Sequence, residues 1–266
     1  NSAEIESFIG SAGFTQIDVS AATARGGWDV RIQDFGNLHG FSGTLKDLSR
    51  ARSQGIFDNL DKFIGSVKTN DSITGLDATV FSITDFYLTD LVHTYTVNGV
   101  DFIFQNFEKI NGGSAQDTFH LLGDIVISAY LNGGGGTDWV DYSAFTTSAV
   151  LVDLPAKKAT ALLGGIEKIE AFIGTPWNDK FIGNSDNNIF EGGAGNDVYV
   201  FNEGWGNDII TDAAGSEDTI DLTLIKSNIL VQIFMNSVQI SSGTNQLTLS
   251  LNTLEKRSEE HTSELQ

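Results

Sequence analysis

Glycine recurs every nine residues between positions 174 and 200, and acidic or amide side chains recur with it. The three consecutive nonapeptides are GTPWNDKFI (174–182), GNSDNNIFE (183–191) and GGAGNDVYV (192–200). Each has Gly in its first place, Asn in its fifth, Asp or Asn in its sixth and an aromatic residue in its eighth. Agreement in four columns over three copies indicates a structural repeat.

The residue types in this repeat are those that bind hard cations. Glycine-rich turns adopt backbone conformations that are closed to other residues, so they can direct several carbonyl oxygens toward one point. The sixth-place Asp adds a carboxylate there, and the last three residues form a short strand whose central side chain points inward. Ca²⁺ takes about six to eight oxygen ligands. The pattern G-G-x-G-x-D-x-U-x, in which U is a large apolar residue, is a known Ca²⁺-binding repeat and predicts that Ca²⁺ is the cofactor.

Two segments match the full pattern, and several match part of it. The complete copies are GGGGTDWVD (133–141) and GGAGNDVYV. The partial copies are TNDSITG (69–75), NGGSAQDTF (111–119), GTPWNDKFI, GNSDNNIFE and GWGNDII (204–210). The candidate metal ligands, through side chains or backbone carbonyls, are Gly133, Gly134, Gly136, Asp138, Gly174, Pro176, Asn178, Asp179, Asp186, Asn188, Gly192, Gly193, Ala194, Gly195, Asn196, Asp197 and Asp208.

The spacing also predicts which loops meet. If each nonapeptide forms half a turn, loops two repeats apart stack on the same side. The loop 174–179 then lies against 192–197, and we expect one Ca²⁺ between them, bound by Asp179, Asp197 and flanking carbonyls. On the opposite side 183–188 would lie against 201–206, where FNEGWG lacks a sixth-place Asp, so a second site there should be weak or empty. For any single copy the alternative is an ordinary Asn-Asp β-turn that binds no ion.

Longer repeats and strand-like segments extend this architecture along the chain. One six-residue motif occurs four times, as IESFIG (5–10), LDKFIG (60–65), FEKING (107–112) and IEAFIG (169–174). Segments such as VDFIF, AVLVDL and VYVF are rich in β-branched and aromatic residues, which favours strands. Repeats that bury their apolar faces against one another predict an all-β fold. We expect a parallel β-solenoid, of the β-roll or β-helix kind, with stacked short strands and Gly/Asn/Asp-rich turns.

Two local predictions accompany this fold. The aromatic residues Phe172, Phe181, Phe190 and Tyr199 should stack as a ladder in the core, and a platform for stacking a ligand is the alternative. The segment 45–64, LKDLSRARSQGIFDNLDKFI, carries charges at helical spacing and is the best candidate for a short surface helix.

The repeat pattern divides the chain into four parts. Residues 1–130 are predicted to be divergent solenoid repeats, 131–212 the calcium-binding β-roll, and 213–256 a further strand unit that is cut short. Residues 257–266, RSEEHTSELQ, resemble the translation of a sequencing adapter and should form a disordered tail. The sequence leaves open whether 14–56 belongs to the solenoid. The absence of an initiator Met predicts a piece of a longer protein.

The charge of the chain restricts its partners. It has 15 basic and 35 acidic residues, which gives a formal net charge of −20 at pH 7. Nucleic acid and anionic membranes would be repelled, whereas cations would be attracted. No run of about 18 apolar residues could insert into a membrane, and Cys is absent. Solubility alone is the other explanation of the acidity.

These motifs resemble the RTX, or haemolysin-type calcium-binding repeat, proteins of bacteria. The resemblance is strongest over 131–212 and weaker over most of 1–256. It implies an extracellular or cell-surface protein exported by type I secretion from a Gram-negative bacterium. It also implies a segment of a large adhesin or surface protein, with calcium ions, neighbouring repeats of the same chain and a cell-surface or glycan ligand as its partners.

Two other functions remain open. One is the non-catalytic calcium-binding module of a type I-secreted hydrolase or toxin. The other is a β-solenoid enzyme acting on polysaccharides, which could use carboxylates such as Asp101, Asp141 and Asp153. The sequence contains neither H-E-x-x-H nor G-x-S-x-G, so it predicts a protein without enzymatic activity.

Overall fold

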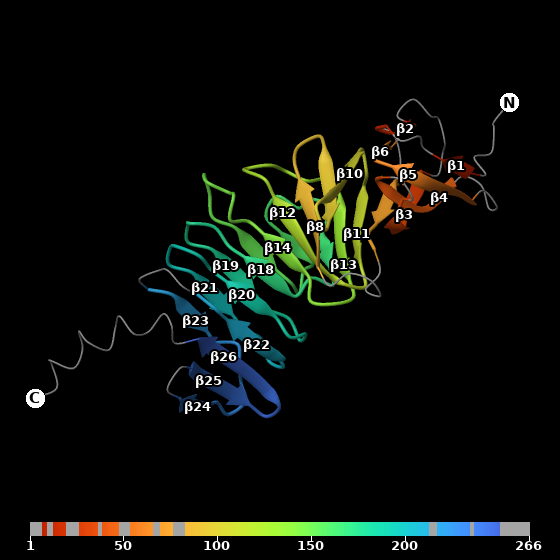
Figure 1. Cartoon of the computed structure of the whole chain (residues 1–266). Coiled ribbons are helices and arrows are strands. Elements are labelled where there is room, and N and C mark those ends of the chain that lie inside the picture. Colours follow the sequence, from red (N-terminus) through yellow and green to blue (C-terminus); the bar gives the residue numbers. More distant parts are fainter. Residues whose placement is uncertain are drawn as a thin grey trace, which may run out of the picture. The chain divides into compact units, whose positions relative to one another are not determined.

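The computed structural model describes residues 7–9, 13–19, 27–36, 39–47, 54–65, 70–76, 83–212, 217–234 and 237–250 (Figure 1). Every regular element in these ranges is a β-strand, so the predicted all-β class is confirmed. Within the same ranges no helix is long and apolar enough to cross a membrane. The chain forms two compact units, Asn1–Val140 with Ala161–Ile169, and Asp141–Thr160 with Glu170–Gln266.

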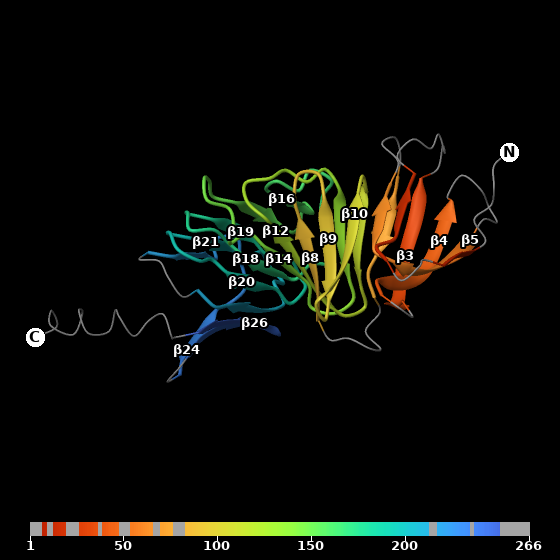
Figure 2. The ribbon, with the colours of Figure 1, turned by 45° about the horizontal axis from the view of Figure 1, so that its top comes forward.

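The first unit contains two sheets, and most of their strands pair in parallel. Each sheet also includes antiparallel neighbours, β3–β4–β5 in one and β8–β9–β10 in the other; Figure 2 shows the latter three side by side. In order of pairing, the first sheet is β1 (Ser7–Ile9), β5 (Gln54–Leu60), β4 (Phe41–Asp47), β3 (Trp28–Phe35), β7 (Ser72–Thr74), β11 (Lys109–Gly113), β13 (Tyr130–Gly134) and β17 (Ile166–Glu167). The second is β2 (Gln16–Asp18), β6 (Lys62–Ile64), β10 (Val100–Gln105), β9 (His93–Val97), β8 (Ile83–Leu88), β12 (Gln116–Leu121) and β14 (Trp139–Asp141).

The second unit repeats this arrangement with shorter strands. Its parallel core is extended by the antiparallel strands β16, β25 and β24. In order of pairing, one sheet is β16 (Lys158–Ala159), β15 (Leu151–Asp153), β19 (Lys180–Ile182), β21 (Val198–Val200) and β23 (Thr219–Asp221). The other runs β18 (Ala171–Ile173), β20 (Ile189–Glu191), β22 (Asn207–Ile210), β26 (Asn245–Ser250), β25 (Ser237–Ser242) and β24 (Leu230–Ile233).

Successive nonapeptides supply strands to alternate sheets, as their spacing predicts. The strand of each repeat therefore pairs with that of the next but one. Phe172 pairs with Phe190 and Phe181 with Tyr199, both at the expected interval of two repeats. The stacking of loop 174–179 against loop 192–197 is thus confirmed.

The predicted partner of loop 183–188 is wrong by two residues. Phe190 pairs with Ile210, so Asn188 lies opposite Asp208 and loop 201–206 is displaced. The two extra residues accommodate Trp205, whose side chain is buried beside Phe201 with ring centroids 6.5 Å apart. An eighteen-residue interval predicts no Asp opposite Asn188, but in the structure Asp208 occupies that position.

The aromatic ladder is a core feature, as expected. Phe172 stacks on Phe190 with ring centroids 6.3 Å apart, and Phe181 stacks on Tyr199 at 5.5 Å. All four side chains are at most 1% exposed. Because no ring face reaches the surface, the alternative of a ligand-stacking platform is contradicted.

The surface helix predicted over 45–64 is wrong in the part that the structure describes. That part belongs to β4, β5 and β6, and residues 48–53 lie outside the described ranges. Leu45 and Phe57 are buried while Lys46 and Ile56 are exposed, which is strand alternation. β3, β4 and β5, which fall largely within 14–56, join the sheet of β7 and β11. The tail 257–266 lies outside the described residues.

Candidate metal centre

The first and sixth places of the repeat are linked because the Asp carboxylate folds back over the glycine. A Cβ atom added to Gly133 would lie 2.3 Å from Asp138 Oδ2, and one added to Gly192 would lie 2.2 Å from Asp197 Oδ2. The same relation holds between Gly174 and Asp179, at 2.4 Å, and between Gly112 and Asp117, at 2.2 Å, which are the second and seventh residues of the segment NGGSAQDTF. The first place must therefore lack a side chain, whether or not an ion is bound.

The second and fourth places have the backbone conformation that the sequence predicts. Gly193 and Gly195 have φ angles of +100° and +119°, and Gly134 and Gly136 have +103° and +114°. This left-handed region is strained for residues with a Cβ atom. The two complete copies thus make the same turn.

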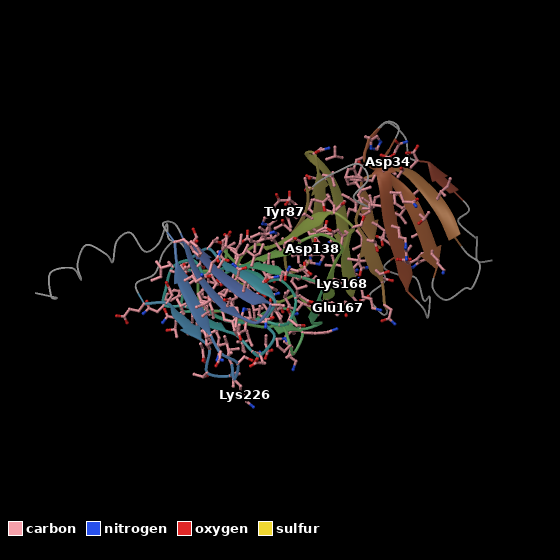
Figure 3. The ribbon with its side chains drawn as sticks, turned by 90° about the horizontal axis from the view of Figure 1, so that it is seen from below. Asp34, Tyr87, Asp138, Glu167, Lys168 and Lys226 are labelled. Carbon is pink, nitrogen blue, oxygen red and sulfur yellow. The ribbon has the colours of Figure 1, made fainter. Side chains whose placement is uncertain are left out.

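One oxygen of the sixth-place carboxylate ties each repeat to a neighbouring one. Asp197 Oδ1 accepts a hydrogen bond from the Asp179 N–H at 2.7 Å, and Asp208 Oδ1 accepts one from the Asn188 N–H at 2.8 Å. Asp138, labelled in Figure 3, accepts one from the backbone N–H of Asp117 at 2.8 Å. These bonds satisfy buried backbone donors at the start of each strand.

The fifth-place asparagines make the corresponding bond in the opposite direction. Asn178 Oδ1 accepts the N–H of Asn196 at 2.9 Å, and Asn187 Oδ1 accepts the N–H of Asn207 at 3.0 Å. The predicted ligands Asn178 and Asn196 are exposed, as are Pro176, Ala194 and Asp186. Amide side chains in this column therefore hold stacked turns together.

The second carboxylate oxygen is the unusual atom of these turns. Oδ2 of Asp117, Asp197 and Asp208 is buried and has no hydrogen-bond partner in the described part of the chain. Burial raises the pKa of Asp117 to about 8, and those of Asp197 and Asp208 to about 7 each. Ionising such a group is costly unless a positive charge approaches it.

Asp179 differs from Asp197, although the sequence predicts that they share an ion. Its Oδ1 accepts hydrogen bonds from Val150 N–H at 2.7 Å and from the Thr175 hydroxyl at 2.9 Å. Its Oδ2 accepts one from the Thr175 N–H at 2.6 Å. Burial raises the pKa of Asp179, and these three bonds oppose that rise. Of the predicted pair, only Asp197 keeps an oxygen without a partner.

Two further acids lie close to the Asp197 carboxylate. One carboxylate oxygen each of Asp197, Asp212 and Asp218 lies within 4.8 Å of the others. Asp197 and Asp212 are buried, whereas Asp218 is exposed. Asp218 Oδ1 accepts the Asp197 N–H at 3.0 Å, and the Tyr199 hydroxyl donates to Asp212 Oδ2 at 2.7 Å. Burial, followed by the nearby Asp212 charge, raises the pKa of Tyr199, so this phenol stays a donor.

Sequence reasoning missed Asp212 and Asp218 because their distance from Asp197 is not a multiple of nine. A weak signal was present, since Asp218 directly precedes TIDLT, whose strand β23 pairs with β21. Asp218 therefore takes the sixth-place position of the next repeat in the stack.

The donor set of this cluster suits a hard divalent cation. All its ligand atoms are oxygens, and three carboxylates within 4.8 Å repel one another unless a positive charge lies between them. Ca²⁺ and Mg²⁺ are both bound by carboxylate oxygens of this kind. Asp197, Asp212 and Asp218 would hold the ion.

Comparison with known proteins adds no assignment. No family model matches the chain, and no curated protein matches it. The function proposed below therefore rests on the carboxylate geometry and the repeat pattern.

The space above the first-place glycine can be tested with two substitutions in one nonapeptide. In Gly133→Ala the new Cβ atom would lie 2.0 Å from the Lys168 carbonyl oxygen, so we expect a loss of about 1–3 kcal/mol of unfolding free energy in urea. The matched control is Gly135→Ala, where the nearest atom is 3.7 Å away and stability should change little. Equal stability of the two variants would contradict this account.

The buried carboxyls predict an inverse pH dependence of stability in chelator. The ordinary carboxyl pKa of 3.8 is raised to about 8 at Asp117 and to about 7 at Asp208, so between these limits the folded state binds more protons than the unfolded state. Stability should therefore fall as pH rises from about 4 to 8. The urea midpoint in EDTA should be higher at pH 5 than at pH 8.5.

Two variants identify the groups responsible for this dependence. Asp117→Asn removes a titrating buried carboxyl, so the difference between the two midpoints should shrink. Asp186→Asn removes an exposed acid and should leave the difference unchanged. A midpoint that rises with pH, or an equal effect of both variants, would be inconsistent with buried protonated carboxyls.

Proposed function

We propose that this chain is a calcium-binding repeat segment of an extracellular bacterial protein, and that it folds and stiffens when Ca²⁺ binds. The observation that carries the proposal is the Asp197 carboxylate, whose Oδ2 is buried without a hydrogen-bond partner among the described residues and which lies beside Asp212 and Asp218. An anionic oxygen in that position needs either a proton or a cation.

The strand order supports a parallel solenoid as the form of the repeat. Strands β18 to β22 enter two sheets alternately, and parallel pairing two repeats apart brings equivalent side chains together. The buried aromatic residues pack on those two repeats away, and Phe190 also packs on Phe181 and Tyr199 of the adjacent repeats. Such a unit has little core of its own, so its stability depends on stacking and on the ions between turns.

Charge supports a cation-dependent fold. The chain carries a formal charge of −20, and part of that charge is buried at the turns. Binding only to the folded state stabilises it by mass action, on the order of 3–4 kcal/mol when free Ca²⁺ is about 100–1,000 times its Kd. Low Ca²⁺ inside a cell would keep the chain loose, and millimolar Ca²⁺ outside would close it.

The RTX resemblance suggests where such a switch operates. A chain exported by type I secretion from a Gram-negative bacterium would leave the cell unfolded and become rigid at the surface. A structural role in a large adhesin or surface protein follows, with Ca²⁺ and neighbouring repeats as the partners. The calcium-binding module of a secreted hydrolase would use the same site, and the parent reading frame would distinguish the two.

Calorimetric titration of Ca²⁺ into divalent-free protein tests the site. Asp218→Asn removes one exposed member of the cluster, so we expect one binding event to disappear or to weaken about ten-fold or more, a change of about 1.4 kcal/mol or more. Glu217→Gln removes the neighbouring exposed acid, which is outside the cluster, and should leave the titration unchanged. Identical titrations for both variants and the unsubstituted protein would contradict a Ca²⁺ site at this cluster.

A further inference from the structure

A cavity of about 250 Å³ lies in the first unit, whereas the acidic cluster belongs to the second. It opens between the β8–β9 hairpin, the segment joining β10 to β11 and the residues before β13. Six of its lining residues offer hydrogen-bonding groups or apolar surface to a ligand: Asp90, Leu91, His93, Asn106, Glu108 and Val126. Its volume is below the roughly 300–1,000 Å³ of pockets for drug-sized ligands, so it suits a single ring.

The imidazole of His93 is a hydrogen-bond donor in the wall of this cavity. The side chain is only 7% exposed, and burial lowers its pKa to about 4, so it is neutral at pH 7. The Thr89 N–H donates to Nδ1 at 3.4 Å, which places the ring proton on Nε2. No described residue provides an acceptor for Nε2 within hydrogen-bond distance. This N–H is open to solvent, so a ligand oxygen can take the place of water as its acceptor.

Acceptors surround that donor. Glu108 uses Oε2 to accept the Asp71 N–H at 2.7 Å, which leaves Oε1 available. Asn106 donates through Nδ2 to the Gly65 carbonyl at 3.2 Å, which leaves its Oδ1. Asn106 also has a φ of +59°, a conformation that costs energy for a residue other than Gly. The exposed Asp90 adds a carboxylate at the rim.

Apolar side chains complete the cavity. Leu91 is 76% exposed and Val126 is 57% exposed, although both lie at a site lined by polar groups. Buried beneath them is Phe107, at 5% exposure. The lining therefore offers apolar contact to one side of a ligand and hydrogen bonds to its edge.

We propose that this cavity binds one neutral sugar residue of a glycan. A hydroxyl group can accept from His93 Nε2 and donate to Glu108 or Asp90, while the C–H face of the ring packs on Leu91 and Val126. Neither Lys nor Arg is among the lining residues, so the two carboxylates repel uronates and sulfated sugars. An organic ammonium would pair with the carboxylates but would leave the His93 donor without an acceptor.

The test is ligand-observed NMR on the full chain in Ca²⁺, by saturation-transfer difference. The probes are the methyl glycosides of glucose, galactose and mannose, with glucuronate and n-butylammonium as charged competitors. We expect saturable binding of at least one neutral glycoside, and binding of glucuronate weaker by about ten-fold or more. Absence of saturable neutral binding, or tighter binding of the ammonium, would overturn the proposal.

Variants locate the binding. His93→Phe keeps a ring against Phe104, 5.1 Å away, but removes the donor, so the affinity should fall about ten-fold or more. Leu91→Ala changes an exposed side chain that folding does not need, and should weaken binding several-fold. Asp124→Asn is an exposed control outside the lining and should bind normally. Unchanged affinity in both His93→Phe and Leu91→Ala would refute a site in this cavity.

Discussion

A carboxylate buried over a glycine at each turn is the constraint on which the repeat depends. Asp197 uses one oxygen to accept a backbone N–H of the repeat two positions earlier, and its other oxygen lies over Gly192. The bond fixes the register between repeats, and the close approach fixes the residue type at the first place. The fifth-place Asn178 adds a bond to the repeat two positions later. Strand pairing and the aromatic ladder follow once this register is set.

The same constraint leaves a buried oxygen that the proposed cation would neutralise. A carboxylate used as a backbone acceptor has a second oxygen, and in Asp117, Asp197 and Asp208 that oxygen is buried without a partner in the described part of the chain. A proton can neutralise it at low pH. The raised pKa values of these three carboxyls reflect the free-energy cost of ionising them in a buried position. In the function proposed above, an ion between repeats would neutralise this oxygen at neutral pH. One buried group would then account both for the register of the repeats and for the proposed ion binding.

Much of this could be predicted where the sequence is periodic. The interval between Phe181 and Tyr199, the left-handed Gly193 and Gly195, and the buried aromatics all follow from the nine-residue period. The reason for the first-place Gly could not be predicted, because it lies in the fold-back of the Asp side chain.

Prediction failed where the period breaks. The segment that buries Trp205 is two residues longer than the period, so Asp208 comes into register with Asn188. Asp212 and Asp218 join Asp197 from positions outside the period. The charges in 45–64 fit helical spacing, but the described residues of this segment belong to β4, β5 and β6, where burial alternates from one residue to the next. The cavity at His93 is built from connecting segments, whose positions only the fold defines.

The most direct measurement is long-wavelength anomalous diffraction from crystals of the full chain grown in Ca²⁺. The account predicts an anomalous peak about 2.3–2.6 Å from Asp197 Oδ2, with Asp212 or Asp218 as a second ligand. A map without a peak at saturating Ca²⁺, with Asp197 Oδ2 sharing a proton with a neighbouring carboxyl, would contradict it. The buried carboxylates would then be structural acceptors alone.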